Sequence, residues 1–269
     1  MNRLAIALVY ALAGTVAFSQ DEPKHDAAEL AKQLANPIAS LVSVPFQSNW
    51  DFSVGPGPDN DTRYLLNFQP VMPFAMTKDW NLIARAIVPY LSQPPLTPGG
   101  SPASGIGDFL VSGFFSPSQP KKVIWGVGPA FQLPVATEAT LGSGQWAAGP
   151  TFVILKQEGH WTFGGLANHV WSFAGDDSRP DVSQTFLQPF AAYTTKKATT
   201  FTLSSETTAN WKASSGDKWT VPVILQVSQL VRLGRRPLSV GVGYGNYVES
   251  PDGGPSWKLR VLVVLLFPK

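Results

Sequence analysis

The chain contains long runs in which apolar and polar side chains alternate residue by residue. The stretch TFTLSSETTAN shows this well, because Phe201, Leu203 and Ala209 lie at every second position and the residues between them are polar. Such a period of two is typical of a β-strand, whose successive side chains point to opposite faces. The alternation predicts twelve strands, at 41–54, 63–76, 81–91, 106–116, 123–135, 146–155, 161–174, 183–194, 199–211, 219–232, 238–248 and 257–267.

The predicted strands are too long for an ordinary soluble sheet. Most span about 10 to 14 residues, whereas soluble strands average five or six and a tilted strand that crosses a bilayer needs about 9 to 11. The last strand, WKLRVLVVLLF, has an unbroken apolar face from Trp257 to Phe267, and we expect this face to meet lipid. Only 14% of the residues are charged, well below the roughly 25% of an average soluble domain. The predicted fold is an all-β, twelve-stranded antiparallel transmembrane β-barrel with a short N-terminal helix.

The connections between these strands alternate in length. Those at 77–80, 117–122, 156–160, 195–198 and 233–237 are tight and mostly basic, whereas the others are longer and richer in Gly, Pro and Asp. Short turns on one side, longer loops on the other and an even number of strands indicate an outer-membrane barrel with both termini in the periplasm. The predicted location is therefore the Gram-negative outer membrane.

The tryptophans support the same fold. All nine lie within about four residues of a predicted strand end, where the aromatic girdles of a membrane barrel occur. The alternative is that they fill the core of a soluble β-sandwich.

The N-terminal 40 residues have a different pattern. Residues 1–19 combine Arg3 with an apolar run and then small residues, which predicts a secretory signal peptide, with a membrane anchor as the alternative. In 20–40, Leu30 and Leu34 lie at helical spacing and Asn36 precedes Pro37, so we expect one short helix in a periplasmic segment. The barrel itself is predicted to occupy 41–269. The exported chain has no Cys and so no disulfide.

Several stretches resemble a known family. They are AKQLANPIASLVSVPFQSNWDF, RYLLNFQPVMPF, DWNLIARAIVPY, GIGDFLVSGFFSP, ATLGSGQWAAGPTFVILKQ and FLQPFAAYTT. Together they resemble proteobacterial outer-membrane proteins associated with the meta-pathway of phenol degradation, which are labelled "transporter" or, misleadingly, "neuromedin U". The resemblance covers the chain from about Ala31 to its end and implies a barrel that conducts small compounds. It carries over no catalytic residues.

Polar side chains on the inner face of the predicted barrel are the candidate site. Charged groups are costly on a lipid-facing wall, so we expect them in the interior, where water or partners are available. They could line a pore and select solutes, or they could pair with one another and fill a narrow barrel. The candidates for a substrate pathway are Asn67, Gln69, Arg85, Asp108, Glu206, Lys258 and Arg260, and Gln47, Asn49 and Asp51 are expected beside them.

Prolines are common inside the predicted strands. Pro129, Pro150, Pro189 and Pro222 are examples, and each lacks the N–H group that a sheet ladder uses. They could produce a lateral opening for apolar compounds, or they could only kink the wall through bulges, which is the interpretation we favour.

Some outer-membrane barrels hydrolyse lipids with a Ser and His pair, so a histidine on the wall is a candidate catalytic residue. Only His169 lies on a predicted wall; alternation places it on the lipid side, although Gly164 and Gly165 could shift the strand register by one residue. No nucleophile motif accompanies it. The three scattered histidines form no metal-ligand cluster, so we expect no metal and no cofactor.

These features together predict a non-enzymatic outer-membrane channel that passively conducts small, aromatic or hydrophobic compounds. One alternative is a plugged barrel with a structural or interaction role, and another is a lipid-modifying hydrolase. The expected partners are outer-membrane lipid, a small-molecule solute and, during biogenesis, the barrel-assembly machinery. The net charge of +2, with acidic and basic residues interspersed, does not indicate nucleic-acid binding.

Overall fold

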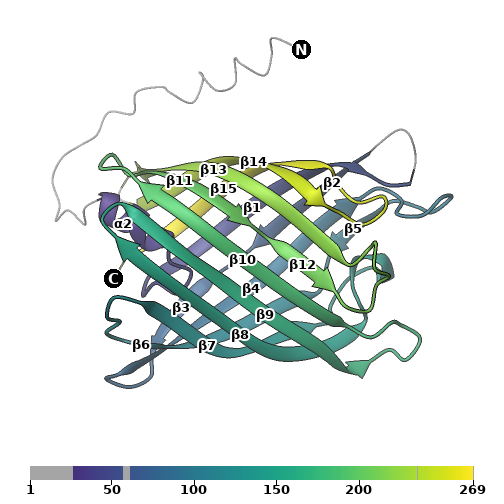
Figure 1. The fold of residues 1–269 in the computed structure, drawn as a ribbon, viewed down its shortest axis with the longest axis horizontal. Coiled ribbons are helices and arrows are strands. Elements are labelled where there is room, and N and C mark those ends of the chain that lie inside the picture. The colour runs from purple at the N-terminus through teal and green to yellow at the C-terminus, as the bar shows by residue number, and fades with distance from the viewer. Residues whose placement is uncertain (1–26, 57–60, 235, 269) are drawn as a thin grey trace, which may run out of the picture.

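The fold was obtained as a computed structural model that describes residues 27–56, 61–234 and 236–268. The predicted signal peptide, 1–19, lies outside these residues. The strands form one closed antiparallel cylinder and run obliquely to its long axis (Figure 1). A cylinder of this kind leaves no unpaired sheet edge, which is the condition for β-structure in a bilayer.

Fifteen strand segments make up the cylinder. They are β1 (Val42–Val54), β2 (Asp61–Phe68), β3 (Val71–Ala75), β4 (Trp80–Gln93), β5 (Ala103–Ile106), β6 (Phe109–Pro117), β7 (Ile124–Leu133), β8 (Gln145–Glu158), β9 (Trp161–Gly175), β10 (Ser183–Thr194), β11 (Thr199–Ser205), β12 (Thr207–Asn210), β13 (Trp219–Leu233), β14 (Arg236–Glu249) and β15 (Trp257–Phe267). The pairs β2/β3, β5/β6 and β11/β12 are each one strand with an interruption, so the wall has twelve strands. All twelve predicted strands are present, and β10 and β15 have the predicted bounds.

The first and last strands close the barrel. β1 pairs with the whole length of β15, from Val42 opposite Phe267 to Phe52 opposite Trp257. The same strand pairs with β2 and β3 on its other side. The closure therefore joins residues at the two ends of the chain, and the aromatic rings of Phe52 and Trp257 stack across it with centroids 3.8 Å apart.

The interruptions have local causes. Between β2 and β3, Pro70 has no N–H to donate, but its carbonyl still accepts a hydrogen bond from Ala86 N at 3.1 Å. Glu206 alone separates β11 from β12. The segments on the two sides of each break pair with the same neighbouring strand, so both stay in the sheet.

The two ends of the cylinder differ. At one end, which we call the turn end, the strands are joined by short turns, and this end also carries α2 (Ala27–Leu34) and the end of β15 (Figure 1). The loop end carries the longer connections, among them the one with the 3₁₀ helix η2 (Ala139–Leu141). No helix in the described ranges is both long enough and apolar enough to cross a membrane.

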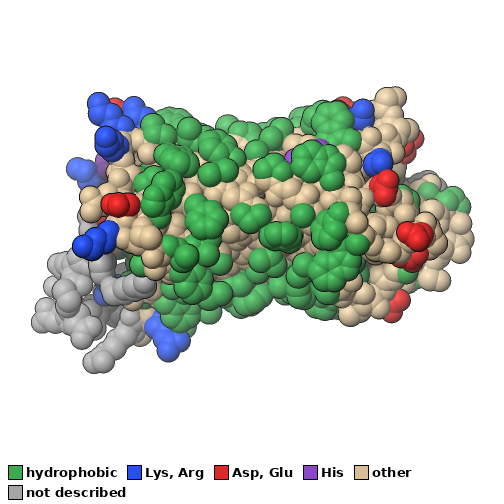
Figure 2. Space-filling model, turned by 90° about the horizontal axis from the view of Figure 1, so that it is seen from below, with side chains coloured by type: hydrophobic (Ala, Val, Ile, Leu, Met, Phe, Trp, Pro, Cys, Tyr) green, Lys and Arg blue, Asp and Glu red, His purple; other side chains and the backbone are tan. Residues whose placement is uncertain are grey.

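The outer surface is apolar around the middle of the cylinder, and charged side chains gather at its ends (Figure 2). In β15 the exposed residues are the predicted lipid-facing ones, whereas Lys258, Arg260, Val264 and Leu266 point inward and are buried. Aromatic side chains lie at both ends of the wall: Trp80 and Trp125 pack edge to face at 5.9 Å, and Trp211 and Trp219 do the same at 5.9 Å.

The wall stays closed at the prolines in its middle. Pro129 of β7 lies opposite Pro150 of β8, so neither can donate to the other. The preceding residues are Gly128 and Gly149, and a Cβ atom on either would collide with a backbone carbonyl of the adjacent strand. Because these glycines let the strands approach so closely, the geometry favours local kinks over a lateral opening.

Candidate functional site in the barrel lumen

The register of the closing strand pair brings polar residues together inside the barrel. Asn49 and Asp51 of β1 lie opposite Arg260 and Lys258 of β15, respectively, and all four side chains are buried. Alternation alone predicts that each points inward. The pairing between the two ends of the chain makes them neighbours.

Asp51 is the centre of one group of contacts. Its Oδ2 accepts a hydrogen bond from Arg63 Nη2 at 2.8 Å, and its Oδ1 accepts one from the Tyr247 hydroxyl at 2.8 Å. The Lys258 ammonium lies 3.3 Å from Oδ1. Two cations therefore share one buried carboxylate.

Glu206 and Arg260 form a second group. The Arg260 guanidinium donates through Nη1 to Oε1 at 2.9 Å and through Nη2 to Oε2 at 2.6 Å, and its Nε donates to Asn49 Oδ1 at 2.8 Å. This bidentate geometry is the strong form of the arginine–carboxylate pair. Glu206 lies between β11 and β12, and both segments pair with β10 in the same register, so alternation directs its side chain towards Arg260 in the lumen.

Arg85 of β4 makes a different kind of contact. Its Nη2 donates to Gln69 Oε1 at 2.8 Å, and Gln69 lies in the interruption between β2 and β3. Asn67 lies two positions before Gln69, opposite Gln47 in the β1–β2 ladder. We call Asp51, Arg63, Arg85, Glu206, Lys258 and Arg260 the lumenal cluster.

Asp108 lies apart from this cluster. Its Oδ2 accepts hydrogen bonds from the backbone N and the hydroxyl of Ser143, both at 2.7 Å, and its Oδ1 accepts one from Ala136 N at 3.3 Å. These contacts tie the connection between β7 and β8 to the wall at the loop end. Of the seven predicted pathway residues, Asp108 is thus the one that anchors a loop.

The N-terminal segment crosses the lumen at the turn end. In α2, Leu30 and Ala31 pack against Leu230, Val264 and Leu266 on the inner face of β13 and β15. Ile38 packs against another part of the wall, in a cluster with Val71, Ile83, Phe114, Val153, Leu155 and Leu166 of β3, β4, β6, β8 and β9. Gln157 of β8 also donates to the carbonyl of Lys32 at 2.9 Å. The segment therefore contacts both halves of the cylinder and narrows its mouth.

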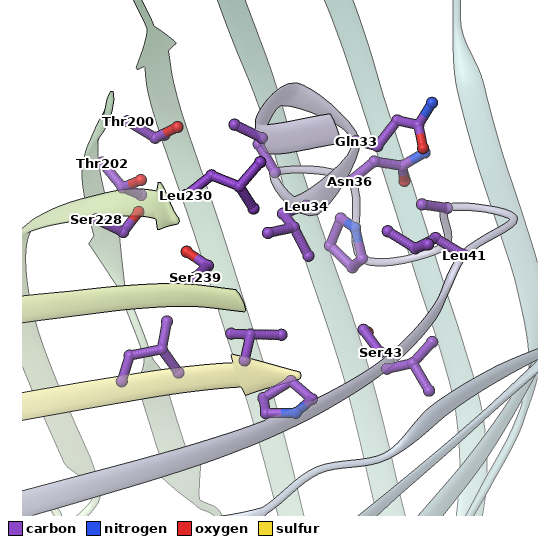
Figure 3. A pocket seen from close by; sticks show the side chains of 18 of the residues that line it. Gln33, Leu34, Asn36, Leu41, Ser43, Thr200, Thr202, Ser228, Leu230 and Ser239 are labelled. Carbon is purple, nitrogen blue, oxygen red and sulfur yellow. The ribbon is translucent and has the colours of Figure 1, made fainter. Parts of the chain in front are cut away.

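A cavity of about 220 Å³ remains between this segment and the inner face of the wall. Leu34 of α2 lies on one side of it and the hydroxyl side chains of Thr202, Ser228 and Ser239 lie on another (Figure 3). Gln69 and Arg85 also line it. The cavity thus has apolar, neutral polar and cationic walls.

His169 lies on the outer face, as alternation predicts, because the β9–β10 ladder runs from Trp171 to Trp161 without a register shift. Its Nδ1 is 2.6 Å from Thr185 Oγ1, and its Nε2 is 3.4 Å from Ser183 Oγ. The Trp211 indole N–H also donates to Thr185 Oγ1, at 2.8 Å. These contacts place His169 in the aromatic girdle at the loop end.

Sequence reasoning missed three participants. Arg63 and Tyr247 complete the contacts of Asp51, and the N-terminal segment lies within the mouth of the barrel. Arg63 could have been found, because it lies on the same face of its strand as Asn67 and Gln69. The amphipathic pattern of α2 indicated that Leu30 needs a partner surface but not which surface it is.

No protein-family model matches the chain, and no curated protein sequence matches it. Among solved structures, it is similar to an outer membrane channel from Pseudomonas putida, with 14% identity over 93% of this chain and 100% of that one and a TM-score of 0.64. It is also similar to outer membrane phospholipase A from Escherichia coli, with 9% identity over 89% and 98% of the two chains and a TM-score of 0.45. At such low identities, the first similarity supports the barrel fold alone.

Proposed function

We propose that the protein is an outer-membrane channel through which small molecules, including aromatic or hydrophobic ones, pass without energy coupling. The observation that carries this proposal is the composition of the two faces of the wall. The outer face is apolar where it would meet lipid, and the inner face holds the lumenal cluster and a cavity that side chains leave open. An interior of this kind can hydrate and guide a solute.

The channel structure from Pseudomonas putida agrees with this proposal at the level of the fold. The association with phenol degradation comes only from the sequence resemblance, and it suggests aromatic compounds as the first solutes to try.

A second candidate function is a plugged barrel that serves as an anchor or interaction protein. It is favoured by the N-terminal segment across the turn end and by the bidentate contact between Glu206 and Arg260. Both features occupy space that a wide pore would leave to water.

Conductance across a planar bilayer tests these two functions against each other. The full mature protein, reconstituted in 1 M KCl, is expected to give discrete conductance steps, and swelling of protein-containing liposomes in small sugars or amino acids is expected to follow. β-rich circular dichroism and a heat-dependent shift in gel mobility show that the protein is correctly folded. If such a protein conducts no current at any applied potential, the result supports the plugged barrel.

A further inference from the structure

Arg85 is the cation of the lumenal cluster with no directly bound carboxylate, because Glu206 pairs with Arg260 and interacts with Arg85 only at longer range. Among the described residues, the ion pairs inside the barrel join Asp51 to Arg63 and Lys258, and Glu206 to Arg260. Both carboxylate oxygens of Glu206 are engaged by Arg260. Arg85 instead donates one hydrogen bond to the neutral amide oxygen of Gln69, and a guanidinium carries several further N–H donors.

The charge of the cluster favours an anion. The cluster holds four cations and only two carboxylates, so it has an excess of two positive charges. The low-dielectric wall around the lumen concentrates the resulting field. A cation held in such a place without a directly bound counter-ion is unfavourable, and a bound carboxylate would relieve this cost.

The cavity beside Arg85 also offers an apolar surface. Leu34 and Pro37 of the N-terminal segment line it together with Leu262 and Val264 of β15. Its volume of about 220 Å³ is below the roughly 300 to 1,000 Å³ of pockets for drug-sized ligands. A single ring or a short alkyl chain is therefore the appropriate size for an occupant.

We propose that this cavity binds a small organic anion, with its carboxylate on Arg85 and its apolar body against Leu34, Pro37 and Val264. The inference rests on the proposed function, because a solute must reach the lumen to bind there. It deepens that function by naming the substrate class: monocarboxylates with an apolar body.

Binding of benzoate to the detergent-purified, full mature protein tests the proposal directly, by isothermal titration calorimetry or equilibrium dialysis. Replacing Arg85 with Gln removes the charge. We expect this variant to bind benzoate about tenfold or more weakly, because the charge-assisted hydrogen bonds to the carboxylate are lost. The matched control is Lys212→Gln, which removes an exposed cation that pairs with Asp181 outside the lumenal cluster and does not line the cavity. This variant is expected to bind benzoate within about threefold of the parent protein.

Two further probes test the two halves of the site. Benzyl alcohol has the ring without the charge, and acetate has the charge without the ring; each is expected to bind at least about tenfold more weakly than benzoate. Any one of three results would overturn the proposal: equal binding by the parent and Arg85→Gln proteins, absence of benzoate binding, or equal affinity for acetate and benzoate. Heat-dependent gel mobility of every variant confirms that the barrel has folded.

The outcome is separable from that of the channel function. Conductance in KCl is measured on the same preparations without benzoate. Conduction without benzoate binding would reject the anion site and leave the channel intact, whereas benzoate binding without conduction would keep the site and reject the channel.

Discussion

Arg260 holds both carboxylate oxygens of Glu206, at 2.9 and 2.6 Å, across the inside of the barrel. The two residues are 54 positions apart in the chain, and the Arg260 side chain is only 4% exposed. The contact therefore links the closing strand β15 to the interrupted strand β11/β12. The lumen consequently contains an ionic crosslink between these two strands.

Breaking this pair is expected to cost stability. Glu206→Gln leaves Arg260 without its anion. Removal of one partner from a fully buried pair costs about 3 to 5 kcal/mol, and we expect a value below this range because the Glu206 side chain is 19% exposed. The denaturant midpoint in detergent measures the effect. The control is Glu158→Gln, which removes one member of an exposed pair with Lys156, and we expect no measurable change there. A Glu206 variant as stable as the parent, with altered ion selectivity, would indicate a hydrated pore-lining residue instead.

The outer and inner faces should tolerate charge differently. Val261 points outward from the middle of β15, and Val261→Arg is expected to cost about 2 to 4 kcal/mol if it lies near the bilayer midplane. Thr202→Arg places the same side chain beside the lumenal cavity and is expected to cost much less. Unfolding midpoints in lipid vesicles compare the two variants. Equal costs would mean that the faces are assigned wrongly.

Arg85 should influence which ions pass. If it lines an open path, Arg85→Gln removes one positive charge from the lumen and shifts selectivity towards cations. Reversal potentials in a KCl gradient measure this shift. We expect the shift to be larger at 10 mM than at 1 M salt, because the Debye length falls from about 30 to about 3 Å. A reversal potential that does not change at low salt would place Arg85 outside the conducting path.

The N-terminal segment should limit conductance. Leu30 is buried between α2 and the inner wall, so Leu30→Ala weakens this contact and is expected to increase the single-channel conductance or the frequency of open events. Glu29 lies on the exposed side of the same helix, and Glu29→Ala is the control. If both variants conduct like the parent protein, the path does not run past the segment.

His169 provides a check on the enzymatic alternative. His169→Ala removes the contact with Thr185, and we expect a modest loss of stability, about 1 kcal/mol, with no effect on conductance. Release of fatty acid from phospholipid vesicles is measured in parallel for both proteins. If the parent protein hydrolyses phospholipid and the His169 variant does not, the outer face is catalytic and the prediction of a non-enzymatic channel is wrong.

The amino-acid sequence determined the strands and their faces. Each strand is long enough for its own alternation to be visible, and the direction in which a side chain points depends only on its position along the strand. The inward direction of Lys258 and Arg260 and the outward direction of Val261 therefore followed from local pattern. The order of short turns and long loops was equally local, because each connection joins neighbouring strands.

Only the tertiary structure decided which inward side chains meet. Asp51 contacts Lys258 because β1 closes onto β15, and Glu206 meets Arg260 across the lumen of the closed barrel. Leu30 packs inside the mouth because the closed wall offers it an apolar inner surface. Each of these contacts joins residues far apart in the chain. The strand register and the curvature of the closed sheet bring these residues together, and both are properties of the whole barrel.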